Sequence, residues 1–247
     1  MNVKNIETLR VIYFELSNIC NYAYMHKKCP LYNATEKIIL STKIIKKIIK
    51  ELECINYSGY IAFHNYNEPL IDPRLFYLTK YIKSILVNAK IGLLTNGFYL
   101  TQDLTDELYE YGIDVIGISL YSKEEEERLC QIQFRHIKVS FYDLYSNGLD
   151  NRKKIYEREH INSTLPCYSL LSEIVIRCTG DVDLCCQDWD FRHIFGNLKN
   201  TSLEEILSTA EVQVLRRDLK QGRRYLDLCR RCNWQRGIDY QFELTKN

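Results

Sequence analysis

Short apolar runs alternate with helically spaced apolar residues along roughly the first 140 positions of the chain. The apolar runs predict five strands, at residues 11–16, 59–64, 91–94, 115–120 and 136–141. Between them, apolar residues recur every three or four positions and predict helices at residues 42–54, 72–86, 104–111 and 123–130. This alternation is typical of parallel βα units. We therefore predict an α/β fold with a partial (β/α) barrel, and an open flavodoxin-like sheet is the alternative.

The pattern changes after about residue 150, where we place a boundary between a unit of residues 1–150 and one of residues 151–247. Apolar residues 172–177 and 182–185 flank Thr179-Gly180-Asp181, which predicts a β-hairpin. Residues 202–205 (Ser-Leu-Glu-Glu) form a capping box that opens a helix, and Gly222 is expected to close that helix. The second unit is therefore predicted to be a small hairpin-plus-helix structure.

Composition narrows the function by exclusion. The 247 residues carry a formal net charge of +1, without the basic excess of nucleic-acid-binding proteins. No apolar run reaches the length of a signal peptide or a membrane span, so we expect a cytoplasmic protein without nucleic-acid or membrane partners. Disulfides are rare in that compartment. The ten cysteines therefore indicate metal or cluster ligation.

Cysteines are concentrated in the last third of the chain. Cys229-Arg-Arg-Cys232 has the C-x-x-C spacing that lets two thiolates meet one metal or cluster, and Cys185, or its neighbour Cys186, and Cys167 could complete the set. Four thiolates suit a [4Fe–4S] cluster or a structural zinc ion. The remaining cysteines on apolar stretches are expected in the core: Cys54, Cys130 and Cys178.

A second candidate site follows the first predicted strand. The loop after residue 16 contains Cys20, His26 and Cys29, and in a barrel such a loop lies at the active-site face. Three ligands would leave one coordination position open for a substrate. His64 ends the second strand beside this face. It could be a catalytic proton carrier or a hydrogen-bonded strand-end residue.

These segments resemble the radical S-adenosylmethionine (SAM) enzymes. Residues 15–21 resemble that family's first strand and first cluster cysteine, and residues 64–69 (His-Asn-Tyr-Asn-Glu-Pro) resemble its Gly-Gly-Glu-Pro segment. Residues 95–97 (Thr-Asn-Gly) and Ser119 fall where the family contacts SAM. The resemblance implies a radical SAM partial barrel, an N-terminal [4Fe–4S] cluster and SAM held by Asn67, Glu68, Pro69, Asn96 and Ser119.

The C-terminal part resembles the family's auxiliary-cluster domain, the SPASM domain, in its short "twitch" form. The matching positions are Cys167, Gly180, Cys185, residues 196–198, residues 202–206 and Cys229-x-x-Cys232. The resemblance implies an auxiliary [4Fe–4S] cluster on Cys167, Cys185, Cys229 and Cys232. Chain length and the order of parts are closest to the family's aminocyclitol dehydrogenases.

The N-terminal loop departs from the family pattern Cys-x-x-x-Cys-x-x-Cys. Counted from Cys20, that pattern lands on Tyr24 and Lys27. Because His26-x-x-Cys29 keeps the terminal spacing, and histidine ligates Rieske clusters, we predict His26 as the third ligand. A cysteine from elsewhere (Cys54 or Cys130), a non-protein group, or loss of this cluster are the alternatives.

The resemblance implies the following chemistry. A flavodoxin- or ferredoxin-type reductant supplies an electron, SAM is cleaved, and a 5′-deoxyadenosyl radical abstracts a hydrogen atom from the substrate. The auxiliary cluster could accept the second electron, which makes a net oxidation of a small molecule of natural-product biosynthesis. A peptide-modifying radical SAM enzyme and a non-enzymatic iron–sulfur or zinc protein are the alternatives.

Overall fold

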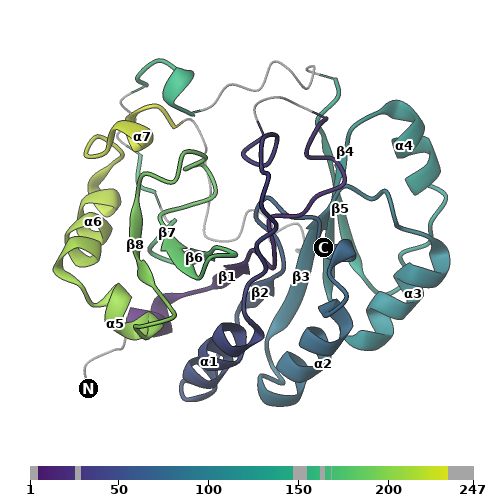
Figure 1. Ribbon diagram of the computed structural model, residues 1–247, viewed down its shortest axis with the longest axis horizontal. Coiled ribbons are helices and arrows are strands. Elements are labelled where there is room, and N and C mark those ends of the chain that lie inside the picture. Colours follow the sequence, from purple (N-terminus) through teal and green to yellow (C-terminus); the bar gives the residue numbers. More distant parts are fainter. Residues whose placement is uncertain (1–4, 26–28, 147–154, 162–164, 168, 233–247) are drawn as a thin grey trace.

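A computed structural model describes residues 5–25, 29–146, 155–161, 165–167 and 169–232, which form one eight-stranded sheet (Figure 1). The strand order is β5-β4-β3-β2-β1-β6-β7-β8. The first five strands are parallel and adjacent in chain order: β1 (Val11–Phe14), β2 (Tyr60–Ala62), β3 (Lys90–Thr95), β4 (Val115–Leu120) and β5 (Lys138–Asp143). A flavodoxin-like order would place β1 between β2 and β3, so the partial barrel is confirmed.

The connecting helices lie together on the outside of this sheet (Figure 1). They are α1 (Thr42–Glu53), α2 (Leu75–Ile85), α3 (Gln102–Tyr111) and α4 (Lys123–Leu129). Helix α1 buries all five of its apolar residues, as its spacing predicts. Helix α3 ends at Gly112, whose φ of 101° suits a residue without a β-carbon. Because these helices pack on the outer face of the sheet, the carboxyl ends of its strands are free to form a site.

Helix α2 begins later than predicted. The pair Asp72-Pro73 was expected to cap and open it, but Asp72 instead follows a short 3₁₀ helix, η2 (Pro69–Ile71). The Asp72 carboxylate accepts from the backbone N–H of Arg74 at 2.9 Å and forms an ion pair with its side chain at 2.7 Å. This local turn occupies the capping carboxylate, so the helix starts at Leu75.

The predicted hairpin extends the same sheet. Strand β6 (Glu173–Ile176) pairs in parallel with β1, and β7 (Asp181–Asp183) and β8 (Ile194–Asn197) continue antiparallel. Gly180 makes the tight turn with a φ of +90°. The predicted boundary between residues 1–150 and 151–247 falls among residues 147–154, outside the described residues, and stays a prediction.

The expected single C-terminal helix is two helices, α5 (Leu203–Leu207) and α6 (Ala210–Gln221). The capping box of Ser202 and Glu205 is present as predicted, but Thr209 caps a new helix by accepting from the Val212 N–H. Gly222 closes α6. The short helix α7 (Asp227–Arg230) and the 3₁₀ helices η1 (Asn5–Thr8) and η4 (Ile155–Glu157) complete the described part.

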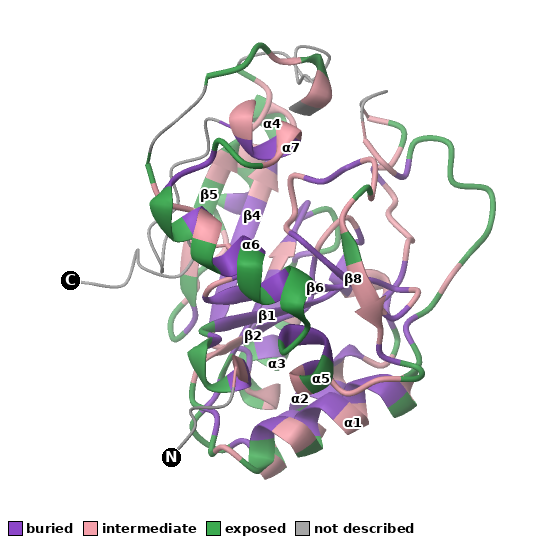
Figure 2. Cartoon of the chain, turned by 90° about the vertical axis from the view of Figure 1, so that its left-hand side faces the viewer, coloured by how far each residue is buried: buried purple, intermediate pink, exposed green. Residues whose placement is uncertain are grey.

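The core lies between the sheet and its helices. Figure 2 shows buried residues along β1, β2 and β6 and on the inward side of α1, with exposed residues on the outward side of α6. All four residues of β1 are buried, as expected for a strand in the middle of a parallel sheet. Among the described residues no helix is both long and apolar enough to cross a membrane.

Candidate active site

A cavity of about 240 Å³ opens at the carboxyl ends of the parallel strands. Most of the predicted SAM-site and N-terminal cluster residues line it: Cys20, Cys29, His64, Asn67, Glu68, Asn96 and Ser119. Pro69 is not among the lining residues and begins η2 directly behind Glu68. Residues distant in sequence thus meet where active sites form in such folds.

Glu68 connects the second strand end with the third. One carboxylate oxygen, Oε1, accepts from Thr95 Oγ1 at 2.7 Å and from the Leu70 N–H at 3.0 Å, and Oε2 accepts from the Asn96 N–H at 2.8 Å. Burial raises the pKa of Glu68 to about 7, although these donors favour the charged form. Since a carboxylate oxygen has two lone pairs, Oε2 keeps one for a ligand in the cavity.

The base of the cysteine loop is fixed by Asn18. Its backbone and side chain exchange hydrogen bonds of 3.0 and 2.8 Å with Ile38, and its Nδ2 donates to the Glu36 carbonyl at 2.8 Å. The Glu68 N–H donates to the Ile19 carbonyl at 2.9 Å. The loop is therefore joined to the segment that resembles the SAM-binding motif.

Cys20 lies beside the Asn96 side chain. Asn96 Nδ2 is 3.8 Å from the Cys20 Sγ and donates to Asn21 Oδ1 at 2.7 Å. Burial, with a smaller contribution from the Glu68 charge, raises the pKa of Cys20 to about 11. This thiol therefore remains protonated near neutral pH until a metal replaces its proton.

The structure tests some of the candidates for the third ligand of the N-terminal cluster, but not His26. His26 lies outside the described residues. Cys54 and Cys130, expected in the core, are exposed because each follows the last turn of a helix as its C-cap, whereas Cys178 is buried as predicted. Neither Cys54 nor Cys130 lines the cavity, which disfavours both as cluster ligands.

A second, smaller cavity of about 20 Å³ contains the predicted auxiliary ligands Cys167, Cys185, Cys229 and Cys232. Burial raises the pKa of Cys185 and of Cys229, and the neighbouring cysteines raise both further. Cys185 therefore lies close to Cys186, Cys229 and Cys167, whose charges raise its pKa in that order. Burial disfavours free thiolates, so buried thiols that lie together in this way are better suited to ligating a metal cluster.

Four thiols that line one small cavity meet the ligand requirements of either a tetrahedral zinc ion or a [4Fe–4S] cluster.

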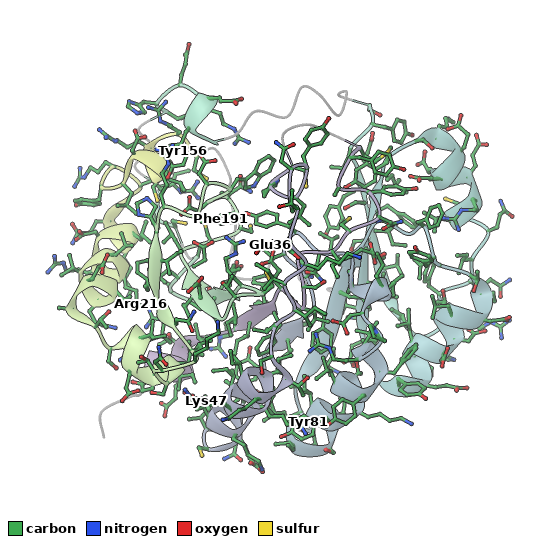
Figure 3. All side chains as sticks on the ribbon, in the orientation of Figure 1. Glu36, Lys47, Tyr81, Tyr156, Phe191 and Arg216 are labelled. Atoms are coloured by element: carbon green, nitrogen blue, oxygen red, sulfur yellow. The ribbon has the colours of Figure 1, made fainter. Side chains whose placement is uncertain are left out.

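The wall between the two cavities contains Cys186, which lines both. Its carbonyl accepts from the Tyr66 hydroxyl at 2.9 Å and from Trp189 Nε1 at 3.1 Å. Tyr66 also meets the ring of Phe191, labelled in Figure 3, edge to face at 6.0 Å. Sequence reasoning missed this wall. The signal that could have found it is the group of aromatic residues directly after Cys186.

An ion pair joins the barrel to the hairpin below this wall. Arg177 Nε donates to Glu15 Oε2 at 3.3 Å, and the Cys178 N–H donates to the same oxygen at 3.1 Å. The Arg177 guanidinium also lies 3.1 Å from the centre of the Phe191 ring. These contacts join the end of β1 to the β6–β7 hairpin and to the segment after β7.

The sequence of the chain is similar to those of known proteins. Residues 167–233 match the SPASM family, an iron–sulfur cluster-binding domain. The chain is similar to the S-adenosyl-L-methionine-dependent 2-deoxy-scyllo-inosamine dehydrogenase of Niallia circulans, with 23% identity over 236 residues, 90% of this chain and 92% of the relative.

Two solved structures share the fold. BtrN in complex with AdoMet and 2-DOIA matches with a TM-score of 0.76 and 23% identity, covering 92% of this chain and 93% of BtrN. The anSMEcpe protein with bound AdoMet and Kp18Cys peptide matches with a TM-score of 0.59 and 13% identity over 92% and 86% of the two chains. The predicted resemblance is confirmed: the chain has the fold of the radical SAM enzymes, with a SPASM domain at its C-terminus.

Proposed function

We propose that the protein is a radical SAM dehydrogenase that oxidises an alcohol carbon of a small cyclitol-like molecule in natural-product biosynthesis. The observation that supports this most directly is that Cys186 belongs to both cavities. A substrate in the larger cavity would therefore lie across the wall of Cys186, Tyr66 and Trp189 from the auxiliary cluster. The similarity to an aminocyclitol dehydrogenase along 90% of the chain points to the same class of reaction.

Each cofactor has matching residues. Cys20, His26 and Cys29 would hold the N-terminal cluster and leave one iron open for SAM. The Asn67 side chain is only 7% exposed, and its Nδ2 has no partner among the described residues, so it would donate to the SAM carboxylate. Glu68 would accept from the SAM ammonium group through its remaining lone pair.

His64 would accept the hydroxyl proton of the substrate. It lines the cavity, is buried, and is oriented by an edge-to-face contact with Tyr13 at 5.1 Å. Bound SAM and the two clusters supply hydrogen-atom abstraction and an acceptor for the second electron. With the proton on His64, the alcohol loses two electrons and two protons in total and becomes a ketone. A flavodoxin- or ferredoxin-type protein would deliver the initiating electron.

The test is anaerobic reconstitution followed by an assay with 2-deoxy-scyllo-inosamine and related cyclitols as probes. We expect about eight irons per chain, 5′-deoxyadenosine, and a ketone in equal amount. A His64→Gln variant should still cleave SAM and form less ketone. About four irons without cleavage would support the non-enzymatic alternative. Cleavage that modifies a peptide and no cyclitol would support the peptide-modifying alternative.

A further inference from the structure

Arg223 lies beside the predicted auxiliary cysteines, and it forms no ion pair with a carboxylate of the described residues. It directly follows Gly222, is 3% exposed, and lines the small cavity. Its Nη1 donates to the Cys232 carbonyl at 3.3 Å and lies 3.8 Å from the Cys232 Sγ, and its Nη2 donates to the Pro166 carbonyl at 3.5 Å. Its Nε has no hydrogen-bond partner among the residues that the structure describes.

A buried guanidinium without an anion is unfavourable. Arginine keeps its proton inside proteins, so it cannot relieve the cost of burial by becoming neutral. The ion pairs of the described residues include none that involves Arg223. An anion that enters the cavity would remove this cost.

The buried cysteines, in turn, need positive charge nearby in order to ligate a cluster as thiolates. Cys229 and Cys232 are 5% and 8% exposed, and they line the same small cavity as Arg223. A cluster held by four thiolates is anionic, so its presence satisfies the cysteines and the arginine together. The cation and the thiols therefore fit one ligand, an anionic iron–sulfur cluster.

We propose that Arg223 raises the reduction potential of the auxiliary cluster, by placing a fixed positive charge and a hydrogen-bond donor beside its ligand sulfur. Reduction adds one negative charge to the cluster, and a nearby cation stabilises the reduced form more than the oxidised form. This inference rests on the proposed function only for the presence of the auxiliary cluster. A higher potential would make the cluster a better acceptor of the electron that leaves the substrate.

The test is a redox titration of the reconstituted full-length protein, followed by electron paramagnetic resonance. The cluster signal that does not change on addition of SAM is assigned to the auxiliary cluster. We expect Arg223→Lys to stay close to the wild type because it keeps the charge. Arg223→Gln and Arg223→Met should lower the equilibrium constant for electron uptake at least tenfold, which for one electron is 59 mV.

Arg216 provides a matched control. It lies on α6 (Figure 3), is also buried, and donates from Nε to the Leu170 carbonyl at 2.8 Å. It does not line the cluster cavity. Arg216→Met should leave the potential unchanged. An equal shift in Arg216→Met and Arg223→Met would contradict a local role for Arg223.

Iron content decides the cases in which a variant loads poorly. Loss of auxiliary iron in Arg223→Gln and Arg223→Met, with retention in Arg223→Lys, would support the charge-offsetting role. Loss in all three variants, or a wild-type potential in loaded Arg223→Gln or Arg223→Met, would overturn the proposal. Since no substrate is needed, a failed dehydrogenase assay leaves this result intact and the two proposals remain distinguishable.

Discussion

The two cysteine cavities differ in which parts of the chain supply their predicted cluster ligands. In the larger cavity, Cys20 and Cys29 belong to one loop whose base is held by Asn18. In the smaller cavity, the predicted ligands come from separate segments before β6, after β7, on α7 and directly after α7. A loop fixed at its base tolerates a ligand displaced by a residue or two, whereas ligands on separate elements depend on the packing of each element. The departure from the family spacing occurs in the loop, where it costs least.

The cavities also differ in size and charge. The larger has about 240 Å³ and a buried carboxylate, Glu68. The smaller has about 20 Å³ and a buried cation, Arg223. A large cavity with a buried carboxylate suits an exchanging cofactor and substrate, and a small cavity lined by thiols suits a permanent group. Variants of each ligand set should therefore give separable effects.

The largest effect is expected from His26→Ala. Loss of an outer partner of a metal ligand already costs 10–100-fold, so removal of a ligand itself should reduce SAM cleavage by at least about 100-fold. Iron should fall from about eight to about four per chain while the auxiliary signal remains. Iron analysis and a 5′-deoxyadenosine assay measure both.

His26→Cys is the matched rescue for this comparison. It restores a cysteine three residues before Cys29 and should recover iron and cleavage. Wild-type iron content in His26→Ala would exclude His26 as a ligand and favour a non-protein group as the third ligand, because Cys54 and Cys130 do not line the cavity.

Cys229→Ala should affect the other cavity alone. Loss of the auxiliary cluster leaves the N-terminal cluster able to cleave SAM, so 5′-deoxyadenosine should persist while ketone formation falls by at least about 10-fold, the lower bound for loss of an outer partner alone. Cys178→Ala is the control, since Cys178 is buried but lies outside the small cavity. Ketone formation at the wild-type rate in iron-depleted Cys229→Ala would show that the auxiliary cluster is not the electron acceptor.

Much of the fold follows from local patterns in the sequence. Buried strands such as β1 and β4 read as apolar runs, and the capping box of Ser202 is visible as such. Strand β5 lies two residues later than predicted because its partly exposed residues give a weak pattern. Strand β8 was missed because it is short and lies at the edge of the sheet, with little buried surface.

The candidate site likewise contains some contacts that the sequence predicts and others that it does not. Glu68 and Asn96 follow strand ends, so their meeting could be predicted from parallel strand order alone. The wall at Tyr66 and Cys186 joins residues 120 positions apart in the sequence, and Arg223 reaches the cysteines only through the packing of α6. No local pattern encodes such contacts, so the structure was needed to find them.

Glu68, which lies in the larger cavity, is expected to make the free energy of unfolding depend on pH. Because its pKa is about 7 in the folded chain and 4.5 ordinarily, the folded state binds more protons between these values. The unfolding free energy therefore falls as pH rises from about 4.5 to 7, by on the order of 3 kcal/mol. Urea unfolding of cluster-free protein at pH 5 and pH 8 measures this, and Glu68→Gln should lack that part of the decrease. An identical pH dependence in both proteins would contradict the assignment.

The smallest expected effect tests whether the two cavities belong to one cooperative unit. Ser202 caps α5 in the C-terminal part, and Thr101 caps α3 in the barrel by accepting from the Leu104 N–H. Loss of either cap, in Ser202→Ala or Thr101→Ala, should destabilise by about 1 kcal/mol. Because β6 pairs with β1 along four residues, the hairpin is part of the barrel's sheet, and both variants should shift one common unfolding transition. If each variant shifted a different transition, the units 1–150 and 151–247 would unfold independently, and the contacts of Arg177 with Glu15 and Phe191 would not couple them.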